Sequence, residues 1–116
     1  MSPRQEPGDL LQGTLGILIL KALLLGPAHG YAVSRYIEEA TADVLTIEEG
    51  SLYPALRRLE DRGWVTSEWG LSENNRRARF YTITRAGRKQ LRSEAAVWLR
   101  YAKAVTRVLR AEPAIA

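Results

Sequence analysis

The 116-residue sequence contains no cysteine and a single histidine, His29. Without cysteine there is no disulfide framework and no thiolate metal site. One histidine alone also argues against a histidine-based metal cluster. The chain lacks paired carboxylates in a plausible register, a Ser/His/Asp set and a phosphate-binding glycine loop as well. We therefore expect no metal, no cofactor and no enzyme activity.

Long hydrophobic runs are also missing. The most apolar stretch, residues 10–25, is interrupted by Gln12, Thr14 and Lys21, whereas a bilayer span needs roughly 20 apolar residues. No basic segment is followed by a small-residue cleavage site, so we expect no signal peptide. These absences predict a cytoplasmic protein without a membrane partner. Residues 10–25 are interpreted as a helix buried on two sides, against its own domain and against a partner.

Acidic residues are absent from one basic part of the chain. The net charge is +4, and six basic residues occur between positions 76 and 89 with no acid among them. They are Arg76, Arg77, Arg79, Arg85, Arg88 and Lys89. Such clustering is the electrostatic signature of a polyanionic partner, typically nucleic acid.

Residues 50–63 predict an amphipathic helix that fits a DNA groove. Leu52, Leu56 and Leu59 recur at i, i+4 and i+7 and form one apolar stripe. The opposite face is small, aromatic and cationic, which suits a groove lined with acceptors and phosphates. An ordinary amphipathic surface helix is the alternative for this stretch alone.

The start of this helix has two interpretations. Thr46 and Glu49 match a capping box, which would begin the helix at Ile47. A start at Ser51 would instead place Pro54 harmlessly in the first turn. In both cases Gly63 is expected to end the helix.

A second helix is predicted upstream, from Gly30 to about Ala42, with Ser34 and Glu38 facing outward. Gly26-Pro27 separates it from the apolar stretch at residues 10–25. His29 lies at its start, where a capping or packing role is expected rather than catalysis. Two short helices joined by a tight turn indicate a helix-turn-helix.

The residues after Gly63 change to the pattern of strands. Residues 64–69 and 79–84 are rich in aromatic and β-branched residues, and the loop at 70–75 favours a turn. They predict a β-hairpin whose Arg76 and Arg77 reach phosphates or the minor groove. A solvated loop with incidental arginines is the alternative. The expected fold is mainly α with a small hairpin (α+β), a winged helix-turn-helix.

The last helix is predicted to run from about Arg85 to Leu109, capped by Thr84. Its apolar residues follow the 4-3-4-3-4 spacing of a coiled-coil seam. They are Leu91, Ala95, Trp98, Ala102, Val105 and Leu109. A helix projecting from a winged helix has little of its own domain to bury this stripe, so we expect a homodimer.

These patterns divide the chain into four segments. Residues 1–8 are expected to be a flexible arm and residues 9–84 a winged helix-turn-helix domain. Residues 85–110 are expected to form a dimerisation helix, followed by a flexible tail at 111–116.

Four segments, at residues 26–33, 50–60, 76–81 and 84–88, resemble the PadR-type transcriptional regulators. The length is similar to the short subfamily with one C-terminal helix. The resemblance implies a homodimeric winged-helix repressor held together by its first and last helices, with Leu11, Leu15 and Leu18 in the interface beside the last-helix stripe. By motif position the DNA-facing residues are Ser51, Tyr53, Pro54, Arg57, Arg58, Arg76 and Arg77.

The expected function is therefore sequence-specific binding of double-stranded DNA at an inverted-repeat operator. The alternative is a winged-helix adaptor that binds protein instead of DNA. Trp98 is either a packing residue or a wall of a cavity between protomers that stacks on a planar effector. The resemblance supports the second interpretation, since some short PadR-type regulators sense planar drug-like compounds at the dimer centre.

Overall fold

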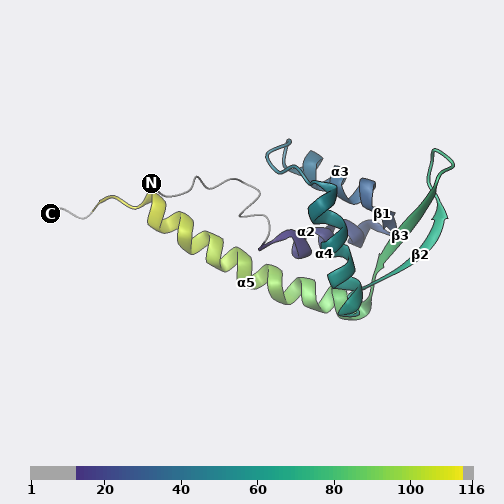
Figure 1. Ribbon diagram of the computed structural model, residues 1–116. Coiled ribbons are helices and arrows are strands. Elements are labelled where there is room, and N and C mark those ends of the chain that lie inside the picture. Colours follow the sequence, from purple (N-terminus) through teal and green to yellow (C-terminus); the bar gives the residue numbers. More distant parts are fainter. Residues whose placement is uncertain (1–12, 114–116) are drawn as a thin grey trace.

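The computed structural model describes residues 13–113. Helices and a small sheet form a body at one end, and one long helix projects from it (Figure 1). In chain order the elements are α2 (Leu15–Ala22), the 3₁₀ helix η1 (Leu23–Leu25), β1 (Ala28–His29), α3 (Gly30–Ala40), α4 (Glu49–Asp61), β2 (Val65–Leu71), β3 (Arg77–Ile83) and α5 (Arg85–Arg110). The predicted fold class, mainly α with a small β component, is confirmed.

The core lies where α2 meets α3, α4 and the start of α5. The predicted stripe of α4 is buried, with Leu52, Leu56 and Leu59 exposed by at most 4%. Ile19 and Leu20 of α2 lie against it in the same cluster. Each such side chain contributes roughly 1.5–3 kcal/mol by leaving water, so this cluster fixes how the helix-turn-helix is held.

The first described helix is shorter than predicted. Gly13 and Thr14 form a turn, and α2 begins at Leu15, so an unbroken helix over 10–25 is wrong. The Thr14 carbonyl accepts the Leu18 N–H at 3.1 Å, which makes Thr14 the residue before the first helical turn. At the other end Gly26 has φ of 137°, a conformation that favours glycine and turns the chain into β1.

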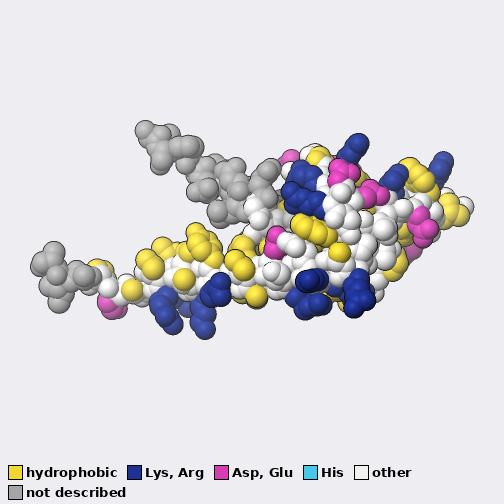
Figure 2. Space-filling model, turned by 90° about the horizontal axis from the view of Figure 1, so that it is seen from below, with side chains coloured by type: hydrophobic (Ala, Val, Ile, Leu, Met, Phe, Trp, Pro, Cys, Tyr) yellow, Lys and Arg dark blue, Asp and Glu magenta, His cyan; other side chains and the backbone are white. Residues whose placement is uncertain are grey.

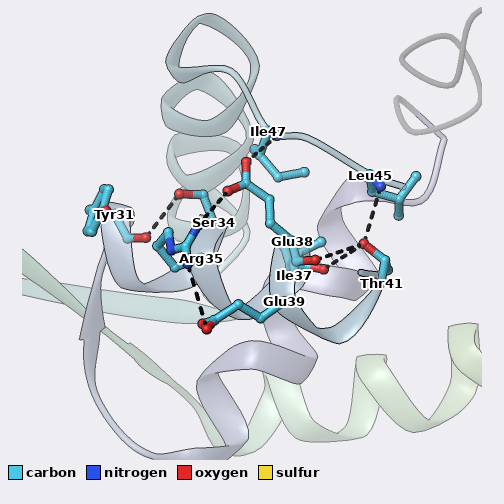
Figure 3. Close-up of polar contacts among 9 residues, drawn as sticks. All are labelled: Tyr31, Ser34, Arg35, Ile37, Glu38, Glu39, Thr41, Leu45 and Ile47. Atoms are coloured by element: carbon cyan, nitrogen blue, oxygen red, sulfur yellow. Dashed lines mark hydrogen bonds and ion pairs between the residues drawn. The ribbon is translucent and has the colours of Figure 1, made fainter. Parts of the chain in front are cut away.

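The turn between α3 and α4 is held by side chains of α3 and of its C-cap residue, Thr41 (Figure 3). The Ile47 N–H donates to Glu38 Oε2 at 2.9 Å. The Leu45 N–H donates to Thr41 Oγ1 at 3.2 Å, and that hydroxyl donates to the Ile37 carbonyl at 3.0 Å. Glu38 therefore faces the turn and holds it, and the outward orientation that the periodicity predicted for it is wrong.

These contacts explain why both predicted starts of α4 are wrong. The helix begins at Glu49, after Glu48, and no side chain caps it, so the capping box of Thr46 and Glu49 does not form. Because Glu38 holds Ile47 by its backbone, the preceding residues stay outside the helix. Pro54 consequently lies in the helix interior, where it has no N–H to donate to the Gly50 carbonyl.

Gly63 ends α4 as predicted. Its φ is 78°, the Trp64 N–H donates to the Leu59 carbonyl at 3.0 Å, and the Gly63 N–H donates to the Glu60 carbonyl at 3.0 Å. This pair of bonds is a Schellman motif. It directs the chain from α4 straight into β2, the first strand of the β2–β3 hairpin, which is called the wing below.

The sheet has three antiparallel strands in the order β1-β3-β2. The predicted hairpin is confirmed, but pairing continues to Leu71 and Arg77, past the predicted strand ends. The two-residue strand β1 pairs Ala28 with Tyr81 and His29 with Phe80. It was not predicted, because two residues carry no periodicity.

Two predicted caps are confirmed. His29 Nδ1 accepts the Ala32 N–H at 3.2 Å at the start of α3. Thr84 Oγ1 accepts the Gly87 N–H at 3.0 Å at the start of α5. Buried Ser34, by contrast, was predicted to face outward; its hydroxyl donates to the Tyr31 carbonyl at 2.9 Å. Its polar atom is thus satisfied inside α3.

Candidate nucleic-acid interface

The outward face of α4 presents three of the predicted DNA-facing residues. Tyr53 is 44% exposed, and Pro54 and Arg57 are also exposed. Ser51, two residues before Tyr53, is half-buried. An aromatic ring, a rigid pyrrolidine and a guanidinium thus share one surface of a helix whose other face is core. This arrangement suits contact with base edges in a major groove.

Tyr53 is also held from behind by α3. A Cβ built on Gly30 would lie 2.8 Å from the Tyr53 hydroxyl oxygen and 2.9 Å from ring carbons. The ring therefore packs directly on the backbone at the start of α3, which only a glycine permits. This contact fixes the ring's position at the surface of the helix-turn-helix.

Arg58 lies on a different side of α4. It lines a small cavity of about 160 Å³ between α2, α4 and α5, together with Gly16, Arg62, Trp64 and Glu94. The predicted contact of Arg58 with DNA stays a prediction. The structure places its side chain apart from that of Arg57.

The wing tip is a tight turn that displays Arg76. The Ser72 N–H donates to the Arg76 carbonyl at 2.8 Å, and Asn75 has a left-handed φ of 60°. Arg76 is exposed at this tip. Arg77, the first residue of β3, lies over the Trp69 ring at 4.6 Å from its centroid, a cation–π contact that holds the guanidinium along the wing.

A polar network joins α4 to both wing strands. Ser67 Oγ donates to Glu60 Oε2 at 2.6 Å, and Arg79 Nε donates to Ser67 Oγ at 2.8 Å. An Arg79 guanidinium nitrogen also lies 3.8 Å from Glu60 Oε2, and its carbon lies 5.5 Å from the Trp69 centroid. Sequence reasoning missed this network, because its members become neighbours only through the strand register. It holds α4 and the wing strands in a fixed orientation to each other.

The electrostatics around this surface are mixed. Glu48 and Glu49 are exposed at the start of α4, where they favour the helix dipole but repel phosphates. In the wing strand β3, burial raises the pKa of Tyr81 above its ordinary value of 10.0. Arg79 opposes this shift and Glu60 adds to it, so the phenol stays protonated below that pH.

The predicted interface residues fall into two groups. Leu15 and Leu91 are buried in the chain's own core, at 3% and 7% exposure, so they serve the fold of one protomer, and Leu91 also borders the groove of the second group. The other group lies along an apolar groove between α2 and α5 or farther out on α5. Its described members are Leu18, Ala95, Trp98, Ala102, Val105 and Leu109. Leu11 lies outside the described residues.

This groove has a volume of about 660 Å³. Its walls include Ile17, Leu18 and Leu24 from the α2–η1 segment, and Ala95 and Trp98 from α5. Trp98 is 43% exposed, Val105 38% and Leu109 79%. Within residues 13–113, one protomer thus leaves a long apolar surface exposed, which is uncommon for a monomer.

Among residues 13–113, no group of three or more His, Cys, Asp or Glu side chains could hold a metal ion. Within that range, no helix combines the length and the hydropathy that a bilayer span requires.

Comparison with known proteins identifies the family. The profile of the PadR-like family of transcriptional regulators matches residues 19–93. The chain belongs to the PadR-like family. Its members are transcriptional regulators rather than enzymes, which confirms that part of the sequence-based prediction. The match spans the helix-turn-helix, the wing and the first part of α5.

Solved structures of PadR-like and related regulators have the same fold. A transcriptional regulator from Clostridium thermocellum is 31% identical, with a TM-score of 0.76 over 85% of this chain and 96% of that one. A PadR family regulator from Eggerthella lenta is 33% identical, with a TM-score of 0.74 over 90% and 88%. The winged-helix fold of DNA-binding regulators is thereby confirmed.

Among curated relatives, the negative transcriptional regulator PadR of Bacillus subtilis is 27% identical over 73 residues. The match covers 63% of this chain and 40% of that protein. The shared part therefore accounts for less than half of the Bacillus regulator.

Proposed function

We infer that the protein is a homodimeric transcriptional repressor that binds an inverted-repeat operator with α4 and the wing. The observation that carries this proposal is that α4 and the wing are held side by side. The exposed Tyr53, Pro54 and Arg57 face of α4 stands beside the wing, and Glu60, Ser67 and Arg79 tie the two together. Repression is the activity named for the Bacillus relative.

The homodimer is supported by the uncovered apolar surface of α5. Val105 and Leu109 are exposed beyond the reach of the chain's own core. A second copy would bury this stripe and pair the two recognition helices about a two-fold axis, which predicts a palindromic site.

Anisotropy titrations of the full chain on duplexes selected from random sequence test the proposal. We expect two protomers per site, half-sites about 34 Å or a multiple apart, and a log K that falls with log salt by about 0.9 per phosphate contact. Binding of one protomer per site, or a flat salt response, contradicts it. Absence of DNA binding would favour the alternative, a winged-helix protein adaptor.

We extend the proposal to a planar aromatic effector in the groove beside Trp98. The groove is apolar, and Trp98 presents a partly exposed indole in its wall, which suits stacking worth about 0.5–1.5 kcal/mol. Planar cationic dyes should quench wild-type fluorescence more than that of Trp98→Phe, and should weaken operator binding. Equal quenching of both proteins would make Trp98 a packing residue only.

A further inference from the structure

The positive charge of this chain is concentrated in α5. The helix contains eight of the 17 Lys and Arg residues but only one, Glu94, of the 13 Asp and Glu residues. Residues 13–84, which include α4 and the wing, contain eight basic and nine acidic residues. The winged-helix part therefore has no excess positive charge, and the formal charge of +7 on α5 supplies the chain's net attraction to polyanions.

The basic residues of α5 are also ordered in space. At 100° per residue, seven of them share one narrow face, and Ala96 is the only other residue on that face. We name this face the cationic ridge. It consists of Arg85, Lys89, Arg92, Arg100, Lys103, Arg107 and Arg110, all exposed. At 1.5 Å per residue the ridge is about 38 Å long.

No described carboxylate neutralises the ridge. The ion pairs within residues 13–113 join Arg35 to Glu38 and Glu39, and Arg79 to Glu60. Glu94, the only acid of α5, is turned away from the ridge and accepts a hydrogen bond from Gln90. The ridge thus presents its full charge to solvent.

The ridge and the apolar seam of α5, which includes Trp98, Val105 and Leu109, lie on roughly opposite sides of this helix. Figure 2 shows Lys and Arg side chains along one edge of the projecting helix and hydrophobic side chains along the other edge. A partner that covers Trp98, Val105 and Leu109 therefore leaves the ridge open except at Arg92, which also lines the groove between α2 and α5. An anionic membrane would instead engage both faces, because a surface-bound amphipathic helix inserts its apolar side.

We propose that the cationic ridge binds the phosphate backbone of duplex DNA, as a contact separate from those of α4 and the wing. The ridge is about as long as one helical turn of the duplex, roughly 34 Å. Five of its seven residues are arginines, whose planar guanidinium groups match phosphate oxygens in a bidentate manner. The inference rests on the DNA-binding function proposed above.

The test uses the full chain and a mixed-sequence duplex of about 42 bp, four helical turns. The variant Arg100→Gln/Lys103→Gln/Arg107→Gln removes three charges from the exposed half of α5, away from the core. We expect the slope of log K against log salt to become shallower by about 0.9 for each phosphate that the ridge no longer neutralises. Affinity at about 0.1 M salt should fall by about tenfold or more.

Two matched variants separate charge at the ridge from other effects. Arg100→Lys/Arg107→Lys keeps the charge and should retain the wild-type slope. Arg76→Gln removes a wing charge, and its effect should add to that of the ridge variant, because independent sites contribute additively. An effect of the ridge variant that disappears in the Arg76→Gln background would overturn a separate contact.

Three results overturn the proposal. The first is a wild-type salt slope in the ridge variant, provided that the wild type binds the duplex. The second is an altered sedimentation coefficient for the variant, which would place the ridge between copies of the chain. The third is loss of binding to phosphatidylserine vesicles without any change on DNA. If the wild-type protein itself does not bind DNA, it is the proposed function that fails.

Discussion

Tyr53 is a surface residue whose position depends on a glycine in another helix. Gly30→Ala would place a methyl group against the ring of Tyr53, and crowding of this kind costs roughly 1–3 kcal/mol. In a Tyr53→Ala background the same change should cost little, because the ring is gone. Urea denaturation of the four proteins of this cycle measures the difference. An equal cost in both backgrounds would show that the contact does not constrain the ring.

Tyr81 should make stability depend on pH in the alkaline range. Its pKa is raised above 10.0, chiefly by burial, so the folded state holds the phenol proton more tightly than the unfolded state does. The resulting stabilisation is fully present below pH 10.0 and is lost as the pH rises through the folded-state pKa.

Denaturant midpoints of wild type and Tyr81→Phe measured from about pH 8 to about pH 11 test this expectation. The variant has no phenol to ionise, so its loss of stability over this range should be smaller. Parallel curves for the two proteins would assign the alkaline loss to other groups.

Helix α4 and the wing have different expected roles in DNA binding. Arg57→Ala should weaken binding to the selected operator by about 1–3 kcal/mol, with little effect on random duplex, if its guanidinium reads a base edge. Arg76→Ala should weaken both duplexes alike, because phosphate contacts carry no direct sequence information. Competition titrations with the two duplexes compare them. Equal losses on both duplexes for Arg57→Ala would remove it from base readout.

Helices and the hairpin were predictable from the sequence where the signal is local. The Leu52–Leu59 stripe, the Gly63 stop, and the caps at His29 and Thr84 all depend on residues within one element. The start of α4 was not predictable in this way. A carboxylate nine residues upstream, on Glu38, holds the Ile47 N–H, and this tertiary contact overrides the local capping signal.

In the candidate site, too, the features with a local sequence signal were predictable and those that depend on tertiary contacts were not. Periodicity placed Tyr53, Pro54 and Arg57 on the outer face of α4, and these side chains are exposed in the structure. It could not separate Arg58, which lies toward α2 and α5. Nor could it find the Ser67–Arg79 hydrogen bond, since residues twelve apart meet only after the hairpin register is set. Their roles on DNA stay predictions.

The assembly of the whole molecule should depend on the outer part of α5. Val105→Glu/Leu109→Glu changes two side chains that are exposed in the protomer, so each protomer should still fold. In a dimer the same carboxylates would be buried without partners, which is strongly unfavourable. We expect sedimentation of a monomer and a loss of operator binding.

Ala104→Glu is the matched control for charge. It adds the same carboxylate at an exposed position next to Val105 in the sequence, but on the far side of α5 from the predicted seam. It should therefore leave the sedimentation coefficient unchanged. A dimer that persists in the double variant would place the interface elsewhere, most simply on the α2 side of the groove.

The joint between α5 and the wing is made of backbone rather than long side chains. The Thr84 N–H donates to the Trp64 carbonyl at 3.0 Å, the Thr84 hydroxyl donates to the Gly63 carbonyl at 2.7 Å, and Gly87 packs against that same Trp64 carbonyl with no room for a Cβ. Apart from the short, β-branched Thr84 side chain, such a joint has no rotamers through which to relax. The 26-residue helix therefore acts as a stiff lever arm, so that a small rotation at its far end would swing the wing base and the end of α4 as one body.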